Sequence, residues 1–341
     1  MNAQATVGTN GAGDPSGPNA HAMAAAMSTK VRPFYWSLRR ELWENRSIYF
    51  APLAVATVVL VSALINLVSL PGGRVPFQQM LDISPHYLRL ASLGLYGVIA
   101  VILGITAGIV GWFYCLDALY GERRERSVLF WKSLPISDTT AVLSKVLTGM
   151  IVVPLVAFVV GLALYVLLMI LASVVLSVNG ASGLQLFANS SFGEAFVVHV
   201  YASMAAILWS APLYAWAIFV SSWVRRATFL WALLPPAAIG LAEGLAFGTN
   251  HFVKMVGERL SGGLKYAFVD SDEVKRQATL EFDNGSVDGN IDFGPTDLPD
   301  SLFSLLDPVR FLSQPGLWIG LAVAAAFVAG SIWMRRYREP L

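Results

Sequence analysis

Long stretches of this sequence carry no charge at all. Residues 146–193 contain no Asp, Glu, Lys or Arg, and an α-helix needs only about 20 apolar residues to cross a bilayer. Charged residues make up 13% of the chain, compared with about 25% of an average soluble domain. The sequence is therefore predicted to form an all-α integral membrane protein.

Six runs are long and apolar enough to be membrane spans. We place them at about residues 48–70, 91–116, 146–171, 195–220, 227–248 and 316–334. In the second run Gly97, Gly104 and Gly111 share one helix face, so another helix of the same chain or of a second copy can approach closely. In the fifth run Pro235-Pro236 removes two backbone donors and should kink the helix or divide it in two.

Basic residues indicate the orientation of these spans. Fifteen of the 23 lysines and arginines fall on one predicted side: five before the first span, five in the loop after the second, two at 225–226 and three after the last. Because cytoplasmic loops carry the excess of Lys and Arg, both termini are predicted to be cytoplasmic. Residues 1–29 lack the features of a signal peptide, so we predict a disordered tail there and a transmembrane domain at 30–341.

An amphipathic segment precedes the first span. Phe34, Leu38 and Leu42 recur every four residues between arginines, and several aromatic residues accompany them. This composition is typical of an interfacial helix that lies in the inner headgroup layer. The alternative is a polar-flanked start of the first span itself.

The predicted cytoplasmic loop at 117–145 contains a short helix with an apolar surface. Glu122 and Arg126 are four residues apart and support one helical turn. Ser127 can cap a second helix over 128–134, which Pro135 ends. This second helix presents four apolar side chains to water, namely Leu129, Phe130, Trp131 and Leu134. An apolar surface of this kind normally docks on a partner.

This loop resembles the first cytoplasmic loop in the permease subunits of bacterial type-2 ATP-binding cassette (ABC) exporters. The resemblance rests on Glu125-Arg126, on Ser127 before the apolar helix, on the turn at 134–137 and on Lys145 at the start of the next span. It implies that the short helix is a coupling helix, which docks on the ATPase subunit. The implied docking residues are Glu122, Glu125, Arg126, Ser127, Leu129, Phe130, Trp131, Leu134 and Pro135. The alternative is a solvated basic connector.

The resemblance also implies a function. The chain would be the permease subunit of an exporter in the bacterial inner membrane, surrounded by membrane lipids and paired with a second permease copy, identical or related. Two copies of a separate ATPase, which bind ATP and Mg²⁺, would drive substrate translocation. The outer half of the fifth span would be bent or would re-enter the membrane. The alternative is a mechanotransmission or regulatory subunit that acts on a periplasmic partner. No nucleic-acid partner is expected.

Two positions within the predicted spans are candidates for a gate or pathway. Glu243 is the only charged residue within a span and lies near the outer interface. It is either a gate at the substrate exit, with Pro235 and Pro236, or an interfacial carboxylate that binds headgroups or the backbone amides around those prolines. His199, in the fourth span, is either a pathway residue or a polar contact between helices.

The sequence lacks signatures of catalysis. It contains no GxxxxGK[ST] phosphate loop, no His-Glu-x-x-His motif and a single cysteine, Cys115. We therefore expect that this chain is not an enzyme and binds no metal or cofactor of its own. We expect Cys115 to be a small buried hydrophobe.

Residues 251–315 form a predicted extracytoplasmic insert between spans five and six. Alternating apolar residues flank Asn284-Gly285, which predicts a β-hairpin. Asp288, Asn290 and Asp292 have the spacing of the first ligands of a calcium loop. Because Phe293 stands where that loop requires Gly, we predict no calcium site.

Overall fold

The computed structural model describes residues 33–69, 85–125, 137–178, 182–188, 190–261, 263–269 and 301–337. Within these ranges the chain is mostly helical, and its one β pairing is an isolated bridge between Phe268 and Leu306. Six helices are long and apolar enough to cross a membrane, at Ser47–Ile65, Ser92–Arg124, Asp138–Val178, Phe192–Trp223, Thr228–Phe247 and Pro315–Tyr337. The chain thus has the all-α architecture of a multi-pass membrane protein, as predicted.

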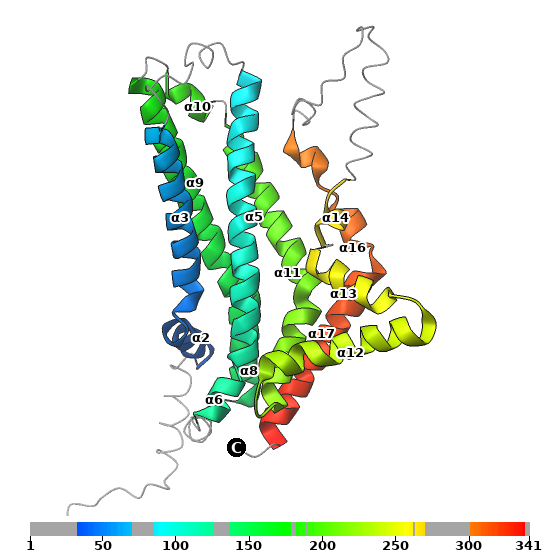
Figure 1. The fold of residues 1–341 in the computed structure, drawn as a ribbon. Coiled ribbons are helices and arrows are strands. Elements are labelled where there is room, and N and C mark those ends of the chain that lie inside the picture. The colour runs from blue at the N-terminus through cyan, green and yellow to red at the C-terminus, as the bar shows by residue number, and fades with distance from the viewer. Residues whose placement is uncertain are drawn as a thin grey trace, which may run out of the picture.

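Five long helices build the bundle. α3 (Ser47–Ser69), α5 (Pro85–Asp117) and α9 (Val153–Val178) pack against one another (Figure 1). α11 (Phe192–Trp223) packs against α5 and, on another side, pairs with α17 (Pro315–Tyr337). The short helix α10 (Leu184–Ala188) connects α9 to α11 at one end of the bundle.

The helix predicted before the first span is present as α2 (Pro33–Glu44). It lies at the end of the bundle opposite α10, at the foot of α3 (Figure 1), and packs against α8. Its aromatic side chains are exposed: Tyr35 and Trp36 are each 54% exposed and Trp43 is 72% exposed. Exposed aromatic rings beside arginines suit a helix that lies in a headgroup layer.

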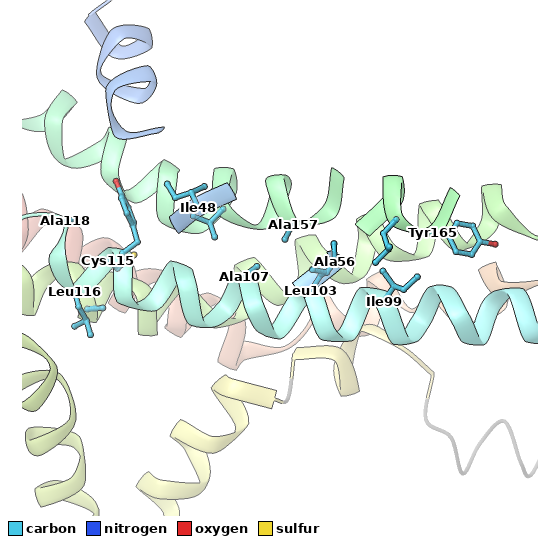
Figure 2. Packing of buried hydrophobic residues seen from close by; sticks show 14 of the residues in the cluster. Ile48, Ala56, Ile99, Leu103, Ala107, Cys115, Leu116, Ala118, Ala157 and Tyr165 are labelled. Carbon is cyan, nitrogen blue, oxygen red and sulfur yellow. The ribbon is translucent and has the colours of Figure 1, made fainter. Parts of the chain in front are cut away.

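The core between α5 and α9 follows the helical repeat of α5. Ile99 and Leu103 are buried on one side of α5 (Figure 2), and a Cβ added at Gly161 of α9 would lie 3.0 Å from Leu103 Cδ1. The other side of α5 is also apolar, and its residues Val101 and Ile105 are 61% and 60% exposed. A helix that is apolar on all sides is expected when lipid replaces water around the bundle.

α9 belongs to a longer continuous helix. α8 (Asp138–Leu147), the π-helical turn η1 (Thr148–Val152) and α9 follow one another without a break. Pro154 has no N–H to donate to the carbonyl of Met150, and a widened π turn accommodates such a loss. Gly149 in this turn packs on Cys115 of α5, where an added Cβ would lie 2.5 Å from the sulfur. Cys115 is fully buried, which confirms its predicted role as a small hydrophobe.

α12 (Thr228–Phe247) and α13 (His251–Ser261) form a helical hairpin that extends sideways from the bundle (Figure 1). Pro235-Pro236 was predicted either to kink the fifth span or to divide it, and division does not occur, because α12 continues through both prolines. The chain reverses instead after Gly248, which adopts a left-handed conformation with φ of 64°. Where a bent or re-entrant outer half of the fifth span was predicted, the structure therefore has α12 followed by a separate returning helix, α13.

Part of the predicted external insert packs on the bundle. Trp209 Nε1 of α11 donates a hydrogen bond of 2.8 Å to the carbonyl of Glu258 in α13. α14 (Gly263–Ala267), η2 (Leu302–Leu305) and α16 (Pro308–Leu312) then lie along α11 and lead to α17. Residues 251–261 and 263–267 are therefore helices that pack on the bundle rather than parts of an open loop.

Several predicted segments lie outside the described residues. They are the tail at 1–29, the coupling helix with its neighbours at 126–136, the β-hairpin at 280–293 and the calcium-like sequence at 288–293.

Candidate functional site: a buried ion-pair cluster beside the predicted docking loop

Charged side chains from four helices meet at the end of the bundle that carries α2. Lys145 of α8 lies at the centre, with its Nζ 2.8 Å from Glu41 Oε1 of α2 and 3.3 Å from Glu122 Oε1. Glu122 belongs to α6 (Tyr120–Arg124), a short helix that follows α5. The side chains of Lys145 and Glu41 are each 3% exposed and that of Glu122 is 6% exposed. These three charges are therefore almost completely removed from solvent.

Two arginines, an aspartate and a tyrosine complete the cluster. Arg335 of α17 bonds both Glu122 Oε2, at 2.5 Å, and Asp138 Oδ1 of α8, at 3.1 Å. Arg40 Nη1 lies 3.5 Å from Glu122 Oε1. Tyr114 of α5 donates its hydroxyl proton to Glu41 Oε2 over 2.8 Å. The three carboxylates thus face three cations, and each oxygen of the two buried glutamates has a partner.

We call these residues the ion-pair cluster: Arg40, Glu41, Tyr114, Glu122, Asp138, Lys145 and Arg335. Removing a charge from water costs several kcal/mol even in real proteins, so a buried pair adds little net stability. Removing one partner is costly, because the other charge is left buried without compensation. The cluster therefore acts mainly to fix α2, α6, α8 and α17 at defined positions relative to one another.

Local sequence explains how these side chains reach the interior. Ser137 caps α8, since its Oγ accepts a hydrogen bond of 3.1 Å from the backbone N–H of Thr140. Lys145 follows the fully buried Val142 by three residues, so both point to the same side of α8. α6 is held against α11 by Arg123, which donates to the carbonyls of Ser221 and Val224 at 2.5 and 2.8 Å.

The cluster lies at both ends of the predicted docking segment. Residues 126–136 are not described, but Glu122 lies just before them and Asp138 just after them, and Arg335 bonds both. Among the predicted docking residues, Arg126, Ser127, Leu129, Phe130, Trp131, Leu134 and Pro135 fall in that segment. Glu125 is described, and its side chain is 67% exposed. Glu122 is buried in the cluster, so it positions the segment instead of presenting its carboxylate to a partner.

Glu243 binds backbone amides, at the turn after α12 and not around the proline pair as predicted. Its carboxylate accepts hydrogen bonds from Thr249 Oγ1 at 2.7 Å and from the backbone N–H groups of His251 and Phe252 at 2.8 Å each. Those amides are the unsatisfied donors at the start of α13. Glu243 therefore caps α13 across the turn of the hairpin.

His199 makes the predicted polar contact between helices. Its Nδ1 lies 2.9 Å from the hydroxyl of Tyr96 in α5, and its ring meets that of Phe158 in α9 edge to face at 4.7 Å. None of these residues contacts Glu243 or the prolines Pro235 and Pro236 of α12. The four residues predicted for a gate or pathway are thus not brought together into one site.

Arg259 of α13 is a partly buried cation that sequence reasoning missed. It donates to the carbonyl oxygens of Trp209, at 3.2 Å, and Gly316. Its guanidinium also lies 4.6 Å from the centre of a Trp209 ring, close enough for a cation–π interaction. Gly320 of α17 leaves the space for it, because a Cβ there would lie 2.5 Å from Arg259 Nη1.

No family model, curated protein or solved structure matches this chain. Within the described ranges no group of three or more His, Cys, Asp or Glu side chains could hold a metal ion. What the site itself offers is mechanical, namely a set of buried ion pairs that connects four helices beside the two ends of residues 126–136.

Proposed function

We propose that this chain is the membrane subunit of an ATP-driven exporter. In this proposal a separate ATPase binds residues 126–136 and moves the helices attached to them. The six candidate spans and the resemblance of the loop to those of type-2 ABC permeases support this function. The observation that carries it is the bridge made by Arg335, which joins the residues on either side of the loop to α17.

The ion-pair cluster supplies the mechanical step. A partner that displaces the loop pulls on α6 through Glu122 and on α8 through Asp138. Arg335 passes this displacement to α17, and Lys145 passes it to α2 through Glu41. Because separating these buried charges is costly, the four helices move together. In this proposal the ATPase holds ATP and Mg²⁺, and substrate crosses between this chain and a second copy.

A docking experiment tests the first half of the proposal. The chain is purified in mild detergent from its native membrane, and nucleotide hydrolysis in the preparation is measured. Phe130→Asp places a charge on the apolar docking surface, so we expect the associated ATPase to be lost. Arg225→Asp changes an exposed cation in the turn between α11 and α12 and serves as the control. Wild-type association of the Phe130→Asp variant would refute the docking site.

A second variant separates docking from transmission. Lys carries the charge of Arg but not its planar fork of donors, so Arg335→Lys cannot bond Glu122 and Asp138 in the same way. We expect the ATPase still to co-purify, whereas stimulation of its activity by the membrane subunit falls. Full stimulation in Arg335→Lys would show that the bridge transmits nothing.

A mechanotransmission subunit is the second candidate. It is favoured by the backbone pairing between residues 267–269 and 305–307, on either side of residues 270–300. The Phe268–Leu306 bridge is reinforced by Val269 N–H to Leu305 O and by Asp307 N–H to Ala267 O, each at 2.9 Å. These bonds bring together the two ends of residues 270–300, so a short linker can replace that segment. Transport that survives the replacement supports the exporter, whereas loss of signalling to an external partner, with ATPase docking intact, supports the mechanotransmission subunit.

A further inference from the structure

A cavity of about 130 Å³ lies between α5, α9 and α11. Small residues create the space, notably Gly104 of α5, Ala157 of α9 and Ala206 of α11. Figure 2 shows part of its wall, where the α5 face that carries Leu103 lies opposite Ala157. No Asp, Glu, Lys or Arg lines the cavity, so a charged ligand would find no counter-charge there.

The α11 side of the cavity offers two free hydrogen-bonding atoms. His199 uses its Nδ1 for Tyr96, and its other ring nitrogen has no protein partner within the described ranges. Ser203, one helical turn further along α11, likewise has no hydrogen bond to the described residues. By contrast, the hydroxyl of Ser210 bonds the carbonyl of Ala206 at 2.6 Å. Polar groups inside a protein are normally paired, so His199 and Ser203 are suited to a ligand.

We propose that this cavity binds a small neutral molecule of phenol size, with an apolar ring and one hydroxyl group. Apolar cavities of about 150 Å³ admit benzene, so the volume suits a single ring. The rings of Tyr96, Phe158 and Tyr214 contribute aromatic surface to the wall. The ligand hydroxyl would bond His199 and Ser203. This inference does not depend on the ATPase, because binding is a property of the chain alone.

Photochemical labelling of the purified full chain in lipid nanodiscs tests the proposal. The probe is a phenol that carries a small diazirine, and mass spectrometry locates the labelled peptides. We expect saturable labelling of α5, α9 and α11 that phenol prevents. Benzene should compete about three- to tenfold less well, which corresponds to the usual net value of one hydrogen bond.

Two matched glycines test the location. A Cβ at Gly104 or at Gly97 meets no atom within 4 Å, so leucine is accommodated at both positions. Of these two glycines, Gly104 lines the cavity and Gly97 does not. We expect Gly104→Leu to weaken the saturable labelling at least about tenfold, by filling a site that holds one ring, and Gly97→Leu to leave it unchanged.

Two matched serines test the chemistry. Ser203→Ala removes a free hydroxyl, whereas Ser210→Ala removes one that already bonds its own helix. We expect Ser203→Ala to reduce the preference for phenol over benzene, because only His199 then bonds the hydroxyl, and Ser210→Ala to keep the preference in full. Labelling that does not saturate, or that is equal in Gly104→Leu and the wild type, would show that lipid chains or water occupy the cavity. Either of those results, or an unchanged preference in Ser203→Ala, overturns the proposal.

Discussion

Lys145 is the residue on which the ion-pair cluster depends most directly. It pairs with two carboxylates, Glu41 and Glu122, and is 3% exposed. Its position at the start of a long uncharged stretch would be unfavourable if its charge were unpaired. The cluster therefore accounts for a lysine at a place where the sequence is otherwise apolar.

Lys145→Met should destabilise the protein by about 3–5 kcal/mol, because it leaves Glu41 and Glu122 buried without their central cation. Thermal unfolding in detergent measures the loss. The double variant Glu41→Gln/Lys145→Met should lose less than the sum of the two single changes, since it removes both members of one pair. Arg124→Met is the control. Its partner Glu125 is exposed, and pairs of that kind contribute only about 0–1 kcal/mol. An additive double variant would contradict the pairing.

Gly149→Ala should destabilise the protein by about 1–3 kcal/mol through overpacking, since the new Cβ would lie 2.5 Å from the Cys115 sulfur. Cys115→Ala in the same chain should restore part of the loss by removing that sulfur. Gly94→Ala is the matched control on α5, where a Cβ meets nothing within 4 Å. The midpoint of thermal unfolding compares the variants. An unchanged midpoint in Gly149→Ala would mean that the π turn and α5 are not in close contact.

At the residue scale, the sequence could reveal which charges were unusual but not which charges pair. Lys145 was noticeable at the start of an uncharged stretch. Its partner Glu41 lies 104 residues away, however, and Arg335 lies 213 residues from Glu122. Contacts at such separations depend on how the helices pack, and that arrangement is not encoded in any local pattern.

At the scale of elements, the hairpin of α12 and α13 is held at its tip and at its base. Glu243 caps α13 at the tip, and Arg259 joins the returning helix to α11 and α17. The face of α13 toward the bundle carries Phe252, Val256 and Arg259, which have helical spacing and are less exposed than their neighbours. The hairpin is thus a fixed part of the fold.

Glu243→Gln should loosen the start of α13, because a neutral amide is a weaker acceptor than a carboxylate for the two backbone N–H groups. We expect amide hydrogens of His251 and Phe252 to exchange roughly three- to tenfold faster, and hydrogen exchange with mass spectrometry measures this change. Glu258→Gln is the control, since Glu258 makes a half-exposed pair with Lys265 further along the chain. Equal exchange in both variants would argue against the cap.

The spans were predictable because each is identified by its own residues, whereas the position of α13 depends on its contacts with other helices. An apolar run of about 20 residues identifies a span without knowledge of its neighbours. α9 continues past the predicted end of the third span at residue 171 to Val178, through residues that nothing in the sequence interrupts. α13 contains Lys254, Glu258 and Arg259, which indicated an aqueous loop. Arg259 can pack against the bundle because it donates hydrogen bonds to carbonyl oxygens of α11 and α17, and these contacts are visible only in the structure.

At the scale of the whole molecule, the two ends of the bundle differ in chemistry. α2, α6 and the ion-pair cluster lie at one end, and α10 lies at the other (Figure 1). The predicted orientation places the charged end in the cytoplasm, because most lysines and arginines fall on that side. Membrane labelling can decide this orientation directly.

Single cysteines at Leu184 and Glu125, in a Cys115→Ala background, should respond differently to a membrane-impermeant maleimide. Leu184 of α10 is 78% exposed and the Glu125 side chain is 67% exposed, so both sites are accessible. In intact cells the cysteine at 184 should react and that at 125 should react only after permeabilisation. A cysteine at Val101, in the middle of α5, should stay unreactive in both states because lipid excludes the thiolate form. The reverse pattern would invert the topology.

The continuous helix from Asp138 to Val178 has 41 residues, which at 1.5 Å per residue gives a rod about 62 Å long. That is about twice the thickness of the hydrocarbon layer. Its foot is held by Lys145 and Asp138, and its far tip adjoins α10. A tilt of about 10° around the foot would sweep the tip through roughly 10 Å. A small displacement of the helix at one membrane surface would therefore produce a large displacement of its far end, and the helix needs no hinge between its ends.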